Sequence, residues 1–263
     1  MTNIIEQQVC NLLDSGDIIF PTCIKNTLSI RKYLTDPDIS LTTIASSLAL
    51  DPIISSHILS AINSPYYGYR VSNLHIAVSL LGASALNFIT FSIIQKQLAA
   101  NVTAETRKIL EQFWLYNLEV TGASCAVATT ETTKEITEEV MVLSMLLNLE
   151  TMFIIFAVDK IGFDCCKSLE NALMIPRLAS QYRTKILRSF LVSSEVEESI
   201  NFVHGNFPDD SNNFATAKDV LLFGRFCVGV PQSLENFISI LPYYANLTDK
   251  HLAIKSHILE SFK

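Results

Sequence analysis

Apolar residues recur along this chain with the three- and four-residue spacing of α-helices. Two consecutive stripes are Leu41, Ile44, Ala45 and Leu48, then Ile54, Ile58, Ala61 and Ile62. Ser40 and Asp51 precede these stripes and are favourable N-cap residues, while Pro52 suits the first helical position. The pattern therefore predicts two helices joined by a short turn.

The same spacing continues through most of the sequence. It predicts further helices over residues 4–13, 22–34, 103–129, 138–160, 169–182, 194–203, 216–228, 234–240 and 249–262. Between Leu74 and Ile94 it predicts two buried helices that meet near Gly82, and residues 206–213 have the composition of a loop. No run of residues alternates with the period of a β-strand, so we expect an all-α, compact multi-helix fold.

The composition supports a folded, acidic protein. Hydrophobic residues make up 49% of the 263 positions, charged residues 17%, and the net charge is −7, which excludes intrinsic disorder. Residues 40–59 have the pattern of a helix-turn-helix, but no Lys or Arg occurs from Leu34 to Tyr69. A DNA-reading helix needs such side chains for phosphates and base edges, so we expect no nucleic-acid partner.

Two apolar stretches are long enough to raise the question of a membrane span. Residues 74–94 contain several polar side chains, and residues 140–158 carry Glu150 at their centre, so we expect neither to enter a bilayer. The first ten residues lack the basic and apolar regions of a signal peptide, and the six cysteines form no C-x-x-C pair. These features favour a cytoplasmic protein with reduced thiols.

Motifs for catalysis or metal binding are missing at the expected spacings. No two of the five histidines stand three or four residues apart, and no phosphate-binding glycine loop is complete. One basic cluster stands out, made of Arg177, Arg183, Lys185 and Arg188. Two interpretations remain open: a solvated helix face paired with the acidic segments 131–139 and 195–198, or a site for an anion or acidic partner.

Several segments together resemble the HDOD family, the HD-related output domain of bacterial signalling proteins. The matching pieces are Phe20-Pro21, Asp51-Pro52-Ile53-Ile54, Ile58-Leu59, Asn63-Ser64-Pro65-Tyr66-Tyr67-Gly68, Leu74, Ala77-Val78 and Leu81-Gly82. The resemblance is most specific from residue 51 to 82 and continues more weakly to about residue 204. It implies an HDOD-like domain over residues 19–210, preceded by an N-terminal helix in residues 1–18 and followed by a helical extension in residues 211–263.

The HDOD family is related to HD-type metal-dependent phosphohydrolases, which need His and Asp ligands around metal ions. Where the hydrolase pattern has a histidine after Trp114, this chain has Tyr116-Asn117, and in place of the His-Asp pair it has Leu147-Asn148. Only His204 is retained from a later histidine position. The resemblance therefore implies that Tyr116, Leu147 and Asn148 are degenerate former metal positions. We accordingly expect no catalytic residue, metal or other cofactor.

The resemblance implies a non-catalytic regulatory module that binds a protein partner in a bacterial signalling pathway. The loop with Asn63, Ser64, Tyr66, Tyr67 and Tyr69 is the predicted partner-binding segment, because tyrosine is favoured at interfaces. In the other interpretation, the asparagine caps a helix and the tyrosines pack inward. The alternative function is a divergent metal-dependent phosphohydrolase with other ligands, for which Glu150, Asp159 and Asp164 are candidates.

Overall fold

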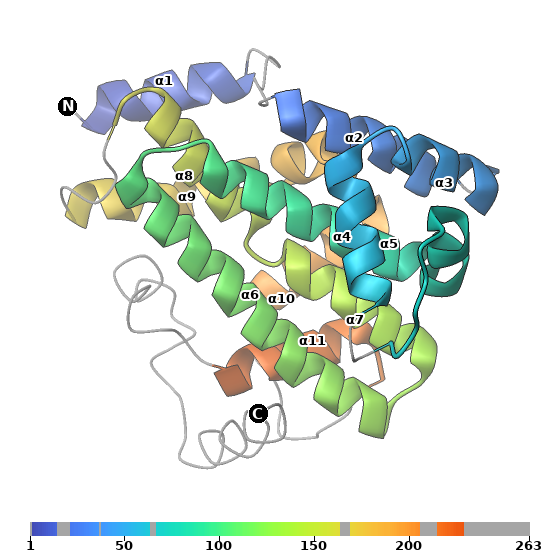
Figure 1. The fold of residues 1–263 in the computed structure, drawn as a ribbon. Helices are drawn as coiled ribbons and strands as arrows, with labels where there is room; N and C mark the ends of the chain where they lie inside the picture. The colour runs from blue at the N-terminus through green and yellow to red at the C-terminus, as the bar shows by residue number, and fades with distance from the viewer. Residues whose placement is uncertain are drawn as a thin grey trace. The chain divides into compact units, whose positions relative to one another are not determined.

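The computed structural model describes residues 2–14, 22–36, 38–63, 67–163, 169–205 and 215–228, and in these ranges it is helical without a strand (Figure 1). The helices are α1 (Thr2–Asp14), α2 (Thr22–Leu34), α3 (Leu41–Leu48), α4 (Pro52–Ile62), α5 (Leu74–Ala100), α6 (Ala104–Glu131), α7 (Lys134–Leu146), α8 (Leu149–Lys160), α9 (Leu169–Ser189), α10 (Ser194–Gly205) and α11 (Ala217–Val228). The predicted all-α fold is confirmed.

The chain forms two compact units. The smaller unit comprises Phe20–Gln97, and the larger unit comprises Met1–Ile19 together with Leu98–Lys263. The boundaries expected from the sequence, at residues 18/19 and 210/211, fall in segments outside the described residues and stay predictions. The same holds for the predicted helices over 234–240 and 249–262 and for the loop over 206–213.

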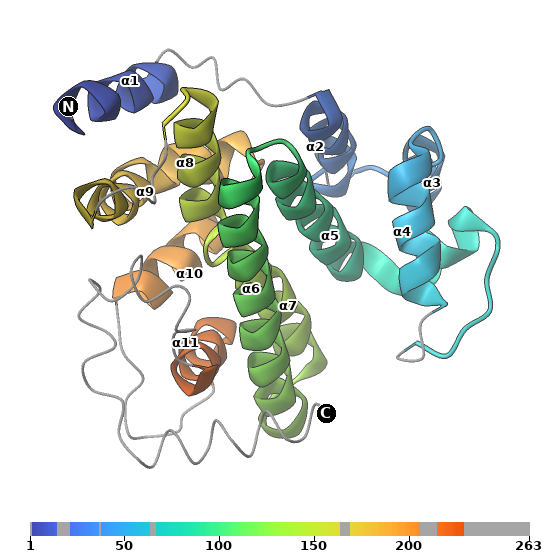
Figure 2. The ribbon, with the colours of Figure 1, turned by 60° about the vertical axis from the view of Figure 1, so that its left-hand side comes forward.

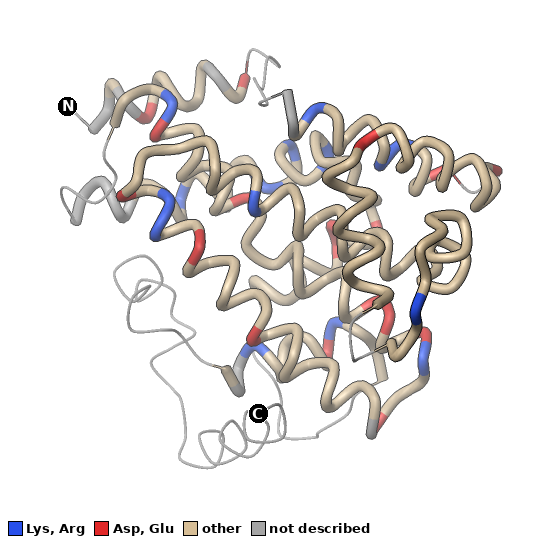
Figure 3. The backbone as a smooth tube through the Cα atoms, viewed as in Figure 1, with Lys and Arg blue, Asp and Glu red and all other residues tan. Residues whose placement is uncertain are grey.

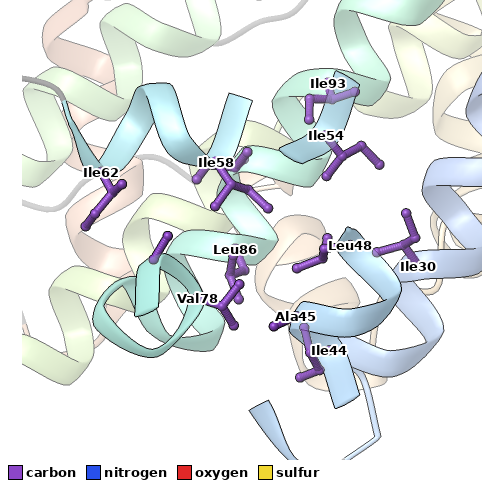
Figure 4. Close-up of a cluster of buried hydrophobic side chains, with 12 residues drawn as sticks. Ile30, Ile44, Ala45, Leu48, Ile54, Ile58, Ile62, Val78, Leu86 and Ile93 are labelled. Carbon is purple, nitrogen blue, oxygen red and sulfur yellow. The ribbon is translucent and has the colours of Figure 1, made fainter. Parts of the chain in front are cut away.

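Helix caps set the two predicted helices in the smaller unit. The Ser40 hydroxyl accepts a hydrogen bond from the Thr43 amide at 3.2 Å, and Asp51 Oδ1 accepts from the amides of Ile53 and Ile54 at 2.9 and 3.1 Å. These contacts satisfy amide groups that the first turn of a helix leaves without partners. The apolar stripes then meet in one core, drawn in Figure 4: Ile30, Ile44, Ala45, Leu48, Ile54, Ile58, Ile62, Ala77, Val78, Leu86, Ile89 and Ile93.

Helix α5 is interrupted at Gly82, as the sequence predicts. Gly82 has φ 74° and ψ 174°, a backbone conformation that residues with a Cβ atom rarely adopt. The glycine thus separates a first segment, residues 74–81, from the remainder of the helix. In the first segment Ala77 and Val78 are buried in the core cluster, and Leu74 and Leu81 pack against it.

The larger unit packs long helices closely, and Figures 1 and 2 show α7 and α11 alongside α6. The α6–α11 contact depends on Gly224. A Cβ atom built on Gly224 would lie 2.0 Å from Ser124 Oγ and 2.9 Å from Ser124 Cα. A side chain at this position would therefore push the two helices apart.

One predicted helix is two helices. Residues 138–160 were expected to be continuous, but α7 ends at Leu146 and α8 begins at Leu149. Between them, Asn148 has φ −125° and ψ 18°, and its side chain does not cap α8. The apolar spacing continues through the break, which is why the hydrophobic pattern alone does not reveal it.

Two helical stretches are long and apolar enough to cross a membrane by length and composition alone. The most apolar window of Lys134–Lys160, which contains α7 and α8, is 83% buried within the protein, whereas that of Leu74–Ala100 is 39% buried. The apolar residues of α7 and α8 are thus used by the core. The expectation that neither stretch enters a bilayer stays a prediction.

Candidate functional site

The candidate site surrounds the break between α7 and α8 in the larger unit. Asn148, in the break, donates a hydrogen bond from Nδ2 to Oδ1 of Asn117 on α6, at 2.7 Å. Both side chains are buried. Of the former metal positions predicted from the sequence, Asn148 therefore contacts another amide, and Leu147 and Tyr116 are buried as apolar residues of the core.

A carboxylate, Glu150, lies two residues further, in the first turn of α8. The Glu150 side chain is fully buried, and its Oε1 lies 3.0 Å from Nε of Arg183 on α9 and 3.2 Å from Nε2 of His204 on α10. The other oxygen, Oε2, has no hydrogen-bond partner. Burial raises the pKa of Glu150, but His204 and Arg183 favour the ionised form, and the net pKa lies below its ordinary value.

His204 connects the carboxylate to the helix break. Its Nε2 lies 2.7 Å from the backbone oxygen of Leu147 as well as 3.2 Å from Glu150 Oε1. Because both oxygens only accept hydrogen bonds, the hydrogen of the imidazole must be on Nε2. Burial lowers the pKa of His204, against the opposing effect of Glu150, so the ring is neutral near pH 7.

The site does not fit a metal ion. Across the described ranges, no group of three or more His, Cys, Asp or Glu side chains could hold one. Asn117 and Asn148 are bonded to each other, and the single histidine donates to Leu147 and Glu150. The positive charge next to Glu150 is the Arg183 guanidinium, whose Nε lies 3.0 Å from Oε1. A guanidinium only donates hydrogen bonds and is not a metal ligand.

The other carboxylates considered from the sequence are also accounted for or outside the described residues. Asp159 accepts hydrogen bonds from the hydroxyl and the amide of Thr103, at 2.6 and 3.2 Å, and thereby braces the start of α6. Asp164 lies outside the described residues. Of these three carboxylates, Glu150 is the one that the described structure connects to the break between α7 and α8, through His204.

The basic cluster on α9 is paired with carboxylates. Arg177 contacts Glu6, Arg183 contacts Glu150, Lys185 contacts Asp14 and Arg188 contacts Glu197. Of these partners, Glu197 alone comes from an acidic segment that the sequence suggested; α1 and α8 supply the others. The four cations thus connect α9 to α1, α8 and α10.

The predicted partner-binding loop belongs to the smaller unit, and its residues differ in their roles. Asn63 holds the loop closed: its Nδ2 donates to the Val71 oxygen at 2.8 Å, and its Oδ1 accepts from the Val71 amide at 2.6 Å. Tyr67 is half-buried against the core, whereas Tyr69 is 45% exposed. Ser64 and Tyr66 lie outside the described residues.

The larger unit contains an ion pair that the sequence analysis did not predict. Glu150 was considered as a metal ligand and Arg183 as part of a surface patch, but the two form one buried ion pair. Their separation of 33 residues gives no local signal. A general signal does exist, because a glutamate within an apolar helix needs a buried cation nearby.

Comparisons with known proteins agree with the helical HD-like architecture. The HDOD domain family matches residues 20–177, and the chain belongs to this family. A search of curated proteins finds no match.

Three solved structures have similar folds. A putative metal-dependent phosphohydrolase from Shewanella amazonensis SB2B has a TM-score of 0.65 at 17% identity, over 100% of this chain and 99% of that one. An HDOD domain protein with unknown function from Geobacter sulfurreducens has a TM-score of 0.59 at 16% identity, over 97% and 94%. A putative signal transduction protein from Marinobacter aquaeolei VT8 has a TM-score of 0.54 at 14% identity, over 99% and 65%.

Proposed function

We propose that this chain is a non-catalytic signalling module that acts by binding a protein partner. One observation carries the proposal: the predicted former metal positions hold Tyr116, Leu147 and Asn148, with Asn148 bonded to Asn117. The nearby His204 and Glu150 are bonded to the protein itself. A hydrolytic HD-type site needs side chains that converge on a metal ion with an open position for water. Here the corresponding side chains satisfy one another.

The arrangement instead has a structural role in the larger unit. Glu150 and His204 join α8 to α10, and Arg183 joins α8 to α9 while also donating to Asn201 of α10 at 3.2 Å. A buried ion pair with additional hydrogen bonds fixes the relative position of the helices that carry it. The residues around the former metal positions thus stabilise a scaffold.

The partner-binding role is proposed for the smaller unit, through Tyr69 of the predicted loop. Asn63 and Tyr67 support that loop from within, so their contribution to binding is indirect. We propose that the protein works in the cytoplasm, where such signalling modules act.

The test measures metal content and hydrolysis on the same preparation. The full chain, purified without affinity metal, is equilibrated with Mn²⁺ or Fe²⁺, desalted and analysed for bound metal, then assayed with bis-p-nitrophenyl phosphate. We expect metal far below one equivalent per chain and no hydrolysis above that of the Glu150→Gln variant.

Stoichiometric metal that is lost in a His204→Ala variant, together with hydrolysis that needs His204, would contradict the proposal. That result would establish the alternative, a divergent metal-dependent phosphohydrolase. The likeness to the Shewanella amazonensis protein supports that alternative through the fold alone.

A further inference from the structure

The first segment of α5 is apolar on two faces, but the core uses one of them. Leu74, Ala77, Val78 and Leu81 face the core cluster of the smaller unit. On the other side, Ile76 and Leu80 are 52% and 43% exposed. These two residues are four apart, so they are neighbours on the helix surface. Folding of the unit does not explain why both are apolar.

The segment of sequence that carries this exposed face has no acidic residue. In a chain with a net charge of −7, no Asp or Glu occurs from Pro52 to Ala104, a range that contains α4 and α5. Figure 3 shows α4 and the first segment of α5 without acidic positions. The same range contains Arg70 and Lys96, so its formal charge is positive while that of the whole protein is negative.

The cation nearest in sequence to the exposed face is available for binding. Arg70 lies in the loop that leads into α5, it is exposed, and within the described ranges it pairs with no carboxylate. The Asn63–Val71 hydrogen bonds hold the backbone of this loop next to Arg70. By contrast, every basic side chain of the α9 cluster has a carboxylate partner.

Resting on the proposed function, we infer that this face binds an acidic amphipathic helix of a protein partner, with Ile76 and Leu80 as its apolar anchors and Arg70 as its electrostatic one. Apolar residues at helical spacing on the partner match a pair of anchors four residues apart. Carboxylates on the partner complement a segment, residues 52–104, that has basic residues and no acidic one. The partial positive charge at the N-terminus of α5 also favours a negatively charged partner.

The experiment determines the chemistry of the partner directly. A library of random 16-residue peptides displayed on phage is selected against the immobilised full chain and counter-selected against the Ile76→Ser/Leu80→Ser variant. We expect the enriched peptides to be net acidic with apolar residues three and four apart. Synthetic copies should bind the wild-type chain at least tenfold more tightly than the double variant, and Arg70→Glu should weaken binding at least fivefold at low salt.

Leu115→Ser is the matched control, because Leu115 of α6 is as exposed as Ile76, at 52%. It should change the affinity by less than twofold, and circular dichroism should show that all variants remain folded. No enrichment, a basic or uncharged consensus, or equal binding to the double variant would overturn the inference. So would binding to phosphatidylglycerol vesicles that the double variant loses while acidic peptides fail to enrich. The metal and hydrolysis measurements decide the non-catalytic assignment separately, so the two failures are distinguishable.

Discussion

The two units of this protein differ in how their basic side chains are paired and in how many large apolar residues they expose. In the larger unit, the basic residues of α9 are each paired with a carboxylate, and in one pair, Arg183–Glu150, the carboxylate is fully buried. In the smaller unit, Arg70 is unpaired among the described residues, and a long acid-free segment surrounds it. The smaller unit also carries seven of the nine large exposed hydrophobic residues of the described chain: Tyr33, Leu41, Leu50, Ile53, Tyr69, Ile76 and Leu80.

The proposed function assigns stability to the larger unit and recognition to the smaller one. The cations of α9 leave little for an anionic ligand to bind, since each of them already contacts a carboxylate of the protein. Exposed apolar residues in the smaller unit contribute little to folding and are available for a partner. If this contrast is correct, substitutions in the two units will have effects of very different size.

The largest effect is expected from breaking the enclosed ion pair. Arg183→Met removes the cation that contacts Glu150 and leaves a buried carboxylate, which should lower the free energy of unfolding by about 3–5 kcal/mol. The measurement is urea denaturation followed by circular dichroism. The control is Lys185→Met on the same helix, whose pair with Asp14 is exposed and should contribute less than about 1 kcal/mol. Equal losses in the two variants would remove the distinction between enclosed and exposed pairs.

The next effect concerns the close contact of α6 and α11. Gly224→Ala places a methyl group against the backbone of Ser124, and over-packing of this kind should cost about 1–3 kcal/mol in the same denaturation experiment. Gly205→Ala is the control, because nothing lies within 4 Å of a Cβ atom at that position. If the Gly224→Ala variant is as stable as its control, α6 and α11 can move apart without a loss in the free energy of unfolding, which would contradict the prediction.

A pH dependence should follow from His204. Its pKa is lower in the folded protein than in the unfolded chain, so the unfolded chain binds the additional proton as the pH falls. Stability should therefore be fully present above the unfolded pKa of about 6.5 and decrease below it, by up to about 1.4 kcal/mol per pH unit. Denaturation between pH 8 and 5.5 measures this slope. In His204→Gln, whose amide does not titrate, the slope should become smaller; an unchanged slope would assign it to other groups.

The smallest effect is expected on the exposed face of α5. Ile76→Ser and Leu80→Ser should each change the free energy of unfolding by less than about 0.5 kcal/mol, since both residues are about half exposed and neither belongs to the buried core. Leu86→Ala, in the buried core of the same unit, should cost about 2–5 kcal/mol. A loss for Ile76→Ser comparable to that of Leu86→Ala would show that this face is needed for folding.

The fold was predictable where local chemistry determines it. Ser40 and Asp51 define helix starts through side chains that bond amides two or three residues away, and Gly82 marks its own break. The end of α7 was not predictable in this way. The apolar spacing runs through Leu147, and the Asn148 side chain bonds Asn117, 31 residues earlier in the chain, rather than a nearby amide.

The candidate site was predictable in its chemistry but not in its connections. The resemblance to HDOD proteins predicts Leu147 and Asn148 as altered positions and His204 as the retained histidine, and this stays a prediction. The structure places His204 Nε2 2.7 Å from the backbone oxygen of Leu147. The contact between Glu150 and Arg183 depends on the packing of α8 against α9, which no short sequence pattern encodes.

The amide pair between Asn117 and Asn148 also restricts how this protein can change over evolutionary time. Asn148→Asp alone would place a carboxylate oxygen against the Asn117 carbonyl oxygen, and Leu147→His alone would place an imidazole at a fully buried apolar position. Each step towards a His-Asp pair destabilises the protein before any metal ion can compensate for it. A His-Asp pair at positions 147 and 148 is therefore reachable only through a less stable single variant, unless both substitutions occur together.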